Sequence, residues 1–533
     1  MSQTAYVLPA SFGQERLWLL DQLRPGSALH NLTGGLRLTG ELDEEALRRS
    51  LRDIVARHEV LRTVLRLDGD RVVQDVLESI DTPLRVVAPA EGPDGVDAVI
   101  RRLDAEPFDL ATAPLIRCHL IRSGPREQVL LLVMHHAIGD GHSIEVLLAE
   151  LAHLYSGHAA GLDPELPELP LQYADFAVWQ RETFESGALD EQIGHWRREL
   201  SGIQPLRLPL DRPRPARPTH VAEVDRVAVP ADVVKTLTAL GSGATPFMVA
   251  VAGYAALLTR WSGQPDVVVG FPSLGRDQGE LLDLVGFFIN TVPLRIPVDA
   301  GQSFADLLSD VRRRCLAANA NSGVPFEKLV ESLSPERVVD RSPLAQAWIN
   351  LQQPHGSVTM KGLTGEPLAL PMSQLPFDVV LDVKEENGGL AGNLGAAADV
   401  FTPETVRRAA RAWEELLAAA AENPAALVSE LPCPLGPATS AAVAAQTPAA
   451  ADDGDSTPST KAEALIAGLW AEIFEDESIS VDQGFYALGG NSLRAVRVIT
   501  RARELGLELP IEVALGEHTI RQLAAEADDT SRS

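Results

Sequence analysis

The stretch VLLLVMHHAIGDGHSIEVLLAE, residues 129–150, decides the fold of this chain. It begins with an unbroken apolar run over residues 129–134, which follows a Ser-Gly-Pro turn signal. Such a run is too short for an ordinary helix and predicts a strand that is buried on both faces. The Gly-Asp-Gly sequence at residues 139–141 then predicts a turn, and an amphipathic helix is expected to begin near His142.

Two adjacent histidines, His135 and His136, stand at the end of the apolar run. Neighbouring side chains on an extended backbone point to opposite faces, so the two imidazoles cannot share one task. We expect one of them to face the fold and the other to face an opening. A neutral imidazole at a strand end, with the carboxylate of Asp140 four residues further on, suits a general base.

Two other interpretations of the histidine pair remain open at this point. Both imidazoles could be hydrogen-bonded within a tight strand-to-helix turn and take part in no chemistry. A metal site is the second alternative, but neighbouring histidines with opposed faces chelate poorly and no third ligand is apparent. We therefore expect no metal.

The composition limits the classes of partner. The chain has 533 residues, which predicts more than two domains' worth of core, and its 45% hydrophobic residues are ordinary for a globular protein. Its formal charge of −28 argues against nucleic acid and anionic membranes as partners. Cys118, Cys315 and Cys433 are widely spaced and predict a reduced, cytoplasmic setting. The N-terminus resembles no secretory signal, and the apolar stretch at residues 247–258 is too short to span a bilayer.

The rest of the first 433 residues alternates helices and strands. Helices are predicted to begin after Asp43, at Pro246 and at residues 402–404, and strands are predicted over residues 115–121, 266–270, 286–296, 377–383 and 390–396. A proline-rich crossover at residues 205–218 separates two halves in which the elements come in a similar order. This order indicates a pseudo-repeat with a cleft between two lobes.

A change of composition marks the end of this region. Residues 434–460 have no apolar periodicity and are rich in Ala, Pro, Ser, Thr and Asp, which predicts a flexible linker. A separate small domain follows at residues 461–530. An apolar helical stripe near residue 465, a helix from Ser492 to Glu504 and a last helix from about Thr519 predict a small four-helix bundle.

With these segments located, the chain resembles a condensation domain of nonribosomal peptide synthetases followed by a peptidyl carrier protein. The resemblance covers nearly the whole chain, and no adenylation domain lies between the two parts. The segments that carry it come in the family's usual order: RHEVLRTVL (57–65), HHAIGDG (135–141), YADFAVW (173–179), VGFFINTVPLR (285–295), VPFEKLV (324–330) and FYALGGNSL (485–493). Two positions depart from the family's pattern, since His142 replaces a frequent Trp and Asn491 a frequent His or Asp.

The resemblance implies a two-lobed α/β (α+β) fold similar to chloramphenicol acetyltransferase. We expect this condensation domain at residues 1–433, with an N-lobe at about 1–180 and a C-lobe at about 181–433. An all-α carrier domain is expected at residues 461–530.

The resemblance also implies roles for the residues of the histidine motif. His136 would lie in a tunnel between the lobes and act as a base on the attacking amine, or orient it by a hydrogen bond. His135 would face the core. Asp140 would form an ion pair with Arg62 or Arg57, and it could equally cap the following helix.

Three further positions are candidates for the site. Gly141 belongs to the turn of the histidine motif. Asn290 could line the tunnel, although a structural amide is the simpler interpretation. Ser492 is either a helix N-cap or, in the FYALGGNSL context, the attachment site of 4′-phosphopantetheine, whose phosphodiester a helix N-terminus favours.

The implied partners are an upstream donor carrier protein, a phosphopantetheinyl transferase and a stand-alone adenylation enzyme that loads the carrier in trans. Amide-forming condensation on carrier-bound substrates is the leading function. The same enzyme class could instead use a hydroxyl or a free amine, which would give an ester or release the product. An epimerase usually follows its carrier, and the intact HHAIGDG argues against a non-catalytic platform for tailoring enzymes. Heterocyclisation is disfavoured because that relative has aspartate in place of the histidine pair.

Overall fold

The protein is described by a computed structural model. The described residues are 3–69, 71–88, 95–124, 126–215, 218–240, 243–333, 342–352, 356–433, 435, 458–474, 479–485, 488, 492–507, 509 and 518–530. Within these ranges, no helix is both long enough and apolar enough to cross a membrane.

The N-lobe is built on a six-stranded sheet with the order β12-β13-β2-β7-β6-β5. Its strands are β2 (Asn31–Gly40), β5 (Leu84–Val87), β6 (Ile116–Arg122), β7 (Glu127–His135), β12 (Val358–Met360) and β13 (Leu363–Pro367). The central strand β7 is buried from Gln128 to its end, which confirms the strand predicted from the apolar run. The helices of the N-lobe are α2 (Glu44–Arg57), α3 (Gly95–Asp104) and α4 (Gly141–His158).

A three-stranded sheet with the order β1-β4-β3 adjoins the N-lobe. Its strands are β1 (Thr4–Pro9), β3 (Thr63–Asp68) and β4 (Arg71–Leu77), and the helical elements of this region are α1 (Phe12–Leu23), η1 (Glu59–Arg62), η2 (His136–Ile138) and α5 (Tyr173–Glu185). Helix α1 begins in a capping box at Ser11, whose side chain accepts from the backbone N–H of Gln14. It packs against η2, the short turn that follows the histidine strand.

The C-lobe has its own six-stranded sheet with the order β10-β9-β11-β14-β15-β8. Its strands are β8 (Ala222–Val229), β9 (Asp266–Ser273), β10 (Asn290–Pro297), β11 (Ala347–Gln352), β14 (Val379–Glu386) and β15 (Gly389–Ala397). Its helices are α6 (Asp190–Glu199), α7 (Ala231–Leu240), α8 (Pro246–Ser262), η3 (Gly279–Leu281), α9 (Phe304–Ala320), α10 (Phe326–Leu333) and α11 (Pro403–Glu422). A core of buried side chains lies between one face of this sheet and helices α7, α8, α9 and α11.

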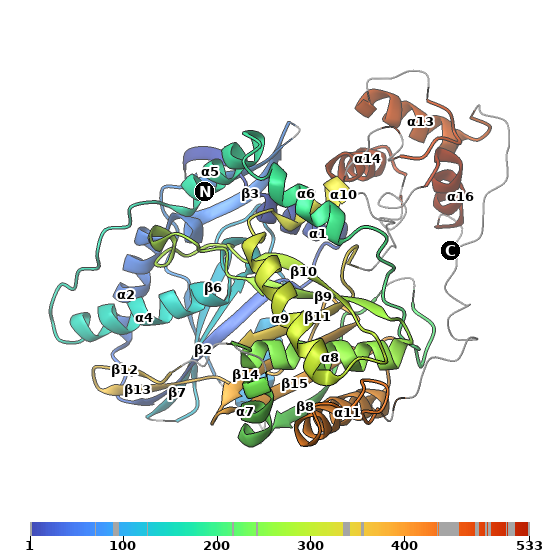
Figure 1. Cartoon of the computed structure of the whole chain (residues 1–533). Coiled ribbons are helices and arrows are strands. Elements are labelled where there is room, and N and C mark those ends of the chain that lie inside the picture. The colour runs from blue at the N-terminus through green and yellow to red at the C-terminus, as the bar shows by residue number, and fades with distance from the viewer. Residues whose placement is uncertain are drawn as a thin grey trace.

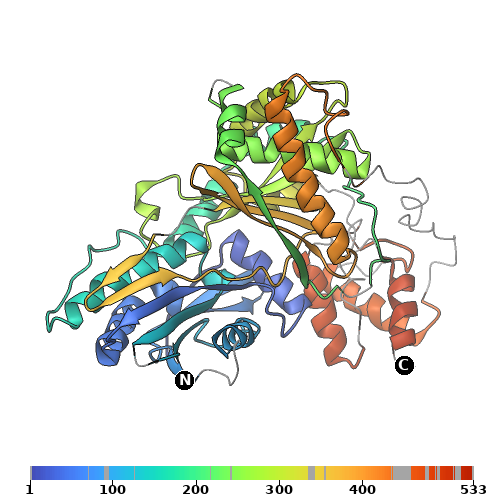
Figure 2. The same ribbon diagram turned by 90° about the horizontal axis from the view of Figure 1, so that it is seen from below.

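A hairpin from the C-terminal half of the condensation region joins the N-lobe sheet (Figure 1). The strands β12 and β13 come from the C-terminal half of the condensation region, yet β13 pairs with β2 in the N-lobe sheet. The expected division of the chain at about residue 180 is therefore incomplete, because the chain leaves the C-lobe after β11 and returns to it at β14 (Figure 2). This crossing places the segment at residues 368–377 between the lobes.

Most local predictions agree with the structure. Thr245 caps α8 with Pro246 in its first turn, and β14 and β15 form a hairpin in which Asn387 and Gly388 have positive φ angles of 52° and 80°. The strand predicted over residues 286–296 is wrong in its first part, since β10 begins only at Asn290.

The described helices of the small C-terminal domain are α13 (Lys461–Phe474), α14 (Ser492–Glu504) and α16 (Ile520–Thr530). They pack on one another around buried Trp470 and Phe485, whose ring centroids are 5.1 Å apart. In Figure 1 this domain stands beside α1 and α10, and α14 contacts α1. Most of the predicted linker and the remaining part of the predicted bundle lie outside the described residues.

Candidate active site

The strand β7 brings the histidine pair to the end of the N-lobe sheet that faces the C-lobe. The backbone N–H of His135 donates to the carbonyl of Leu115 (3.0 Å), and that of His136 donates to the carbonyl of His30 (2.8 Å). These bonds fix where the strand ends. The turn η2 then leads to Asp140, which caps α4.

His135 faces the protein interior. Its side chain is buried, and its Nδ1 accepts the backbone N–H of Ala137 at 3.1 Å. Its ring also meets the edge of Phe108. Burial, with a smaller contribution from His136, lowers the pKa of His135 to about 3. His135 is therefore a neutral imidazole that supports the turn.

His136 has different surroundings. Its Nδ1 lies 2.9 Å from the carbonyl oxygen of Gly139, which can only accept, so Nδ1 carries the hydrogen and Nε2 has the free lone pair. Burial lowers the pKa of His136, while Asp140 and the Gly139 carbonyl partly oppose this shift. Nε2 makes no hydrogen bond with any described residue, and Phe287 packs edge-on against the ring at 5.4 Å. The site thus offers a neutral imidazole with an available acceptor nitrogen.

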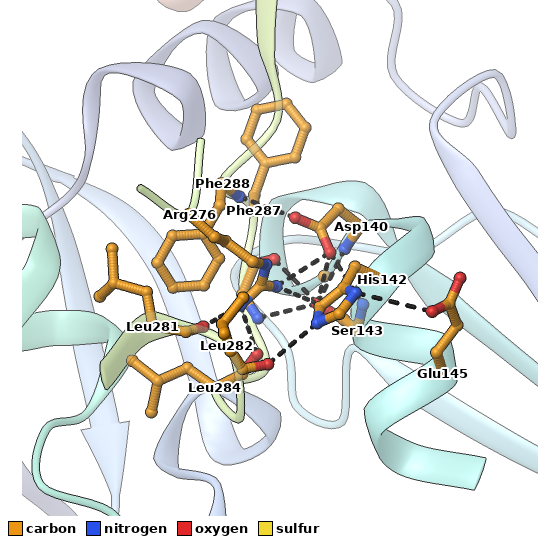
Figure 3. A network of polar contacts seen from close by, with 12 residues as sticks. Asp140, His142, Ser143, Glu145, Arg276, Leu281, Leu282, Leu284, Phe287 and Phe288 are labelled. Atoms are coloured by element: carbon orange, nitrogen blue, oxygen red, sulfur yellow. Dashed lines mark hydrogen bonds and ion pairs between the residues drawn. The ribbon is translucent and has the colours of Figure 1, made fainter. Parts of the chain in front are cut away.

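Asp140 is fully buried and accepts from both lobes (Figure 3). Within the N-lobe its Oδ1 accepts the backbone N–H of Ser143 (2.8 Å) and the hydroxyl of Ser143 (2.7 Å). From the C-lobe it accepts the Nη2 of Arg276 (3.1 Å) at Oδ1 and the backbone N–H of Phe288 (3.1 Å) at Oδ2. Asp140 therefore caps α4 and also joins the two lobes.

Arg276 belongs to the loop between β9 and β10, residues 274–289, which we call the inter-lobe loop. It is buried and lies with its guanidinium 4.0 Å from the ring centroid of Phe288. Its Nη1 donates to the carbonyls of Leu281 (2.5 Å) and Leu284 (2.7 Å). Figure 3 shows how these bonds gather the loop around the first turn of α4.

The predicted ion-pair partners of Asp140 are wrong. Arg57 pairs with Glu150 at 2.8 Å, and Arg62 pairs with Glu59 at 3.2 Å. Both arginines lie close to the end of α2, where these carboxylates are nearer to them than Asp140. The cation that neutralises Asp140 instead comes from the C-lobe.

The other candidate positions have clear structural surroundings. The side chain of Asn290 donates to the carbonyls of Ser322 (2.8 Å) and Val324 (2.7 Å), and its oxygen accepts the backbone N–H of Phe326 (3.0 Å). This is the structural amide that we considered simpler than a tunnel-lining residue. Gly141 is the first residue of α4, and a Cβ placed there would meet open space.

Two residues of the site were missed by sequence reasoning. Arg276 is 136 residues away from Asp140 in the chain, and no local pattern marks its partner. Gln14 on α1 donates from Nε2 to the carbonyl of Ala137 (3.0 Å), directly after the histidine pair. Gln14 is a buried amide, and the sequence signal that could have singled it out is the capping-box pattern Ser11-x-x-Gln14 at the start of α1.

In the small domain, helix α14 begins at Ser492. The side chain of Ser492 and the preceding Gly489, Gly490 and Asn491 lie outside the described residues. A helix N-terminus presents unpaired backbone N–H groups and the positive end of the helix dipole, so this position fits a phosphodiester.

Comparison with known protein families shows to which family the chain belongs. The family described as "Condensation domain" matches residues 4–435, which include the histidine motif, the inter-lobe loop and both lobes. The chain belongs to the condensation-domain family. A second family, described as "Phosphopantetheine attachment site", matches residues 464–527. The predicted order of condensation domain and carrier domain is confirmed, and the carrier domain bears covalently attached 4′-phosphopantetheine.

The curated relatives of this condensation domain are peptide synthetases. A linear gramicidin synthase of Brevibacillus parabrevis is 39% identical over 440 residues, covering 80% of this chain and 6% of that protein. Phosphinothricin tripeptide synthetase PhsC of Streptomyces viridochromogenes is 38% identical over 435 residues, covering 80% of this chain and 40% of that protein. The chain thus spans less than half the length of these relatives.

Solved structures agree with the two-lobed α/β fold. The X-domain from teicoplanin biosynthesis has a TM-score of 0.74 and 28% identity, covering 81% of this chain and 99% of that one. The four-domain nonribosomal peptide synthetase holo-AB3403 has a TM-score of 0.75 and 20% identity, covering 89% of this chain and 37% of that one. This second likeness concerns the fold alone.

Proposed function

We propose that this chain forms an amide bond between a carrier-bound acyl or peptidyl thioester and an amine held by its own carrier domain. The observation that supports this most directly is the Nε2 lone pair of His136, which no described residue occupies. The Gly139 carbonyl holds the ring through Nδ1 at the junction of the two lobes. Its relatives are peptide synthetases, which supports the same class of reaction.

In the proposed reaction the amine nitrogen attacks the thioester carbonyl carbon. The C–N bond forms, the C–S bond breaks, and the proton that the amine loses finally resides on the departing thiol. The lone pair at Nε2 of His136 receives a hydrogen bond from the amine, either to orient it or to accept its proton. The low pKa of His136 keeps that lone pair free at neutral pH.

The surrounding residues hold this imidazole in place. His135 and Gln14 fix the backbone of the turn at Ala137. Asp140 and Arg276 bind the turn to the C-lobe. We assign positioning roles to these four residues, since enzymes of this type gain rate by holding two reactants in one geometry.

We propose Ser492 as the residue that carries 4′-phosphopantetheine, whose thiol holds the substrate as a thioester. The helix start at this residue supports the assignment. The contact of α14 with α1, and of α1 with η2, links the carrier to the histidine turn through one helix. The partners that follow are a donor carrier, a phosphopantetheinyl transferase and a separate adenylation enzyme, all in the cytoplasm.

The test supplies a donor carrier loaded with an acyl group and loads this chain with an amino acid. Intact-protein mass spectrometry should show the acyl group transferred to the aminoacyl chain on Ser492. The Ser492→Ala protein should gain no phosphopantetheine mass when treated with coenzyme A and a broad-specificity transferase. A full mass gain on the alanine variant would place the attachment elsewhere.

A non-catalytic platform is the second candidate. A solved complex joins the teicoplanin X-domain to OxyB, and that chain is 29% identical to this one with a TM-score of 0.74. If the chain were only a platform, no acyl group would be transferred from any loaded donor carrier, whether the acceptor is an amine or an alcohol. Transfer to a hydroxyl or a free amine would instead support ester formation or product release.

A further inference from the structure

The C-lobe sheet has a second face, which is turned away from its helices. Alternate residues of its strands, such as Ile349 and Leu381, belong to the C-lobe core, so their neighbours point to this second face. The crossing segment at residues 368–377 covers part of it, because a Cβ placed at Gly395 would come within 2.5 Å of the sulfur of Met372. The second face therefore looks into the space between the lobes.

The crossing segment also touches the N-lobe. The backbone N–H of Leu368 donates to the carbonyl of Gly35 (3.0 Å), and the hydroxyl of Ser373 donates to Oδ2 of Asp104 (3.4 Å). The carbonyl of Asp104 accepts the side-chain amide of Asn31 (2.5 Å), and Asn31 pairs in register with His135 across β2 and β7. The second face and the histidine turn thus border the same inter-lobe space.

A row of polar side chains crosses the second face on four neighbouring strands. Asn350 pairs in register with Asp382, Asp382 with Asn393, and Asn393 with Arg226. Residues paired across a sheet project from the same face, so the four side chains stand side by side. We call them the Asp382 row.

The centre of this row is a carboxylate without a cation. Oδ1 of Asp382 accepts the amide of Asn350 (3.0 Å) and Oδ2 accepts the amide of Gln352 (2.6 Å). No Lys or Arg of the described ranges lies within ion-pair distance of Asp382. Lys384, the next residue along β14 on this face, pairs with Glu386 at 3.1 Å, and Arg226 is two strands away. Burial raises the pKa of Asp382 to about 6. A partly buried carboxylate is costly unless a charge partner is supplied.

The amides beside Asp382 can complete a binding site for a cation. Asn350 and Gln352 use their N–H groups on the carboxylate, and their carbonyl oxygens accept no hydrogen bond from any described residue. A primary ammonium has three donors and no acceptor. One carboxylate and two amide oxygens match that set. At Asp382 an anionic group would meet a like charge, and an apolar group would find no hydrogen-bond partner; Arg226 stands two strands away, at the end of the row.

We propose that the Asp382 row is a recognition subsite for a substrate side chain that ends in a primary ammonium group. The proposal rests on the proposed function, since the ligand is an amino acid tethered to a carrier. The side chain can belong to the donor acyl group or to the acceptor amine. The shared chemistry is a lysine-like ammonium on an aliphatic chain.

The experiment compares lysine with norleucine, which has the same aliphatic chain without the ammonium. In one arm the chain's own carrier bears lysine or norleucine as the acceptor, and in the other the donor carrier bears them. The kcat/KM ratio of lysyl to norleucyl substrate should be about 10 to 100 in one of the two arms. Asp382→Asn keeps the shape and removes the charge, so the ratio should fall about 10- to 100-fold, as expected for one charged hydrogen bond.

Asp225→Asn is the matched control. Asp225 lies on β8 beside the row but pairs with Leu394, a residue of the core side of the sheet, so this variant should leave the ratio unchanged. Wild-type protein without a lysine preference in either arm would overturn the subsite, as would an unchanged ratio in a folded Asp382→Asn protein. Calorimetric binding of lysyl- and norleucyl-pantetheine makes the same comparison without catalysis. If the protein prefers the lysyl ligand in binding but forms no amide product, the proposed function is contradicted and the subsite still stands.

Discussion

At the scale of single residues, His135 and His136 are adjacent but differ in what they touch. His136→Ala should lose most product formation, because it removes the Nε2 lone pair, and should lower the melting temperature less than His135→Ala, because it gives up only the Gly139 hydrogen bond and the Phe287 contact at the junction of the lobes. His135→Ala should lower the free energy of unfolding by about 2–4 kcal/mol, since it leaves a cavity and an unpaired Ala137 N–H. Product mass spectrometry and thermal melts measure both. Equal activity loss without a stability difference would contradict this division.

His135 also makes the stability of the protein depend on pH. Its pKa is about 3 in the folded protein and 6.5 when unperturbed, so between these values the unfolded state binds more protons. The free energy of unfolding must therefore fall as the pH drops below about 6.5 and continue to fall towards about 3. His135→Asn keeps an acceptor for Ala137 and does not titrate.

The comparison of the two proteins isolates this group from the other buried histidines. Denaturation curves between about pH 6.5 and about pH 4 should show a shallower loss of stability in His135→Asn than in the wild type. Parallel pH profiles would mean that His135 is protonated in the folded protein or already neutral in the unfolded one.

At the scale of elements, the first turn of α4 and the inter-lobe loop form one unit through Asp140 and Arg276. Asp140→Asn or Arg276→Met should each lower the free energy of unfolding by about 3–5 kcal/mol, because each leaves a buried charge unpaired. A double-mutant cycle on the two should give a coupling energy of about 1–3 kcal/mol. The same cycle on Asp140 and Arg62 should give none, since Arg62 pairs with Glu59. A coupling to Arg62 would restore the partner that the sequence predicted.

Elements that depend on local pattern were predictable from the sequence. The strand β7, the cap of α8 and the β14–β15 hairpin follow from apolar runs, a Thr-Pro start and an Asn-Gly turn. Residues 286–289 were misassigned to a strand because they are apolar. Their apolar side chains serve the contact between the lobes and not a sheet. Phe288 packs on Tyr173 and Phe176 of the other lobe, at ring distances of 5.1 and 4.6 Å.

Contacts between distant segments were not predictable. The ion pair of Asp140 with Arg276 and the transfer of β12 and β13 to the N-lobe sheet depend on how the lobes meet. The element order pointed only to a cleft between two lobes, and the resemblance to a family named Arg62 or Arg57 where the structure has Arg276. The histidine pair was the exception, because opposed faces on one strand separate their roles without any tertiary information.

At the scale of the whole molecule, the chain joins a condensation domain and a carrier domain through a segment without apolar periodicity. Separating the chain within residues 441–455 should give two folded pieces, because the helices of the small domain pack on one another around buried Trp470 and Phe485. Phosphopantetheine loading should be unaffected, since it needs only the small domain. The pieces should still react when mixed, but more slowly at low concentration, because the tether sets an effective local concentration of the carrier.

The measurement is the product rate against protein concentration for the tethered and the split forms, each supplied with the same loaded donor carrier. The intact chain should keep its rate on dilution, whereas the rate of the split pair should fall in proportion to the carrier concentration. The contact of α14 with α1 predicts that the split pair approaches the tethered rate once that surface is saturated. A split pair that matches the intact chain at low micromolar concentration would show that this carrier is not the main acceptor. The amine would then be presented by a carrier on another polypeptide.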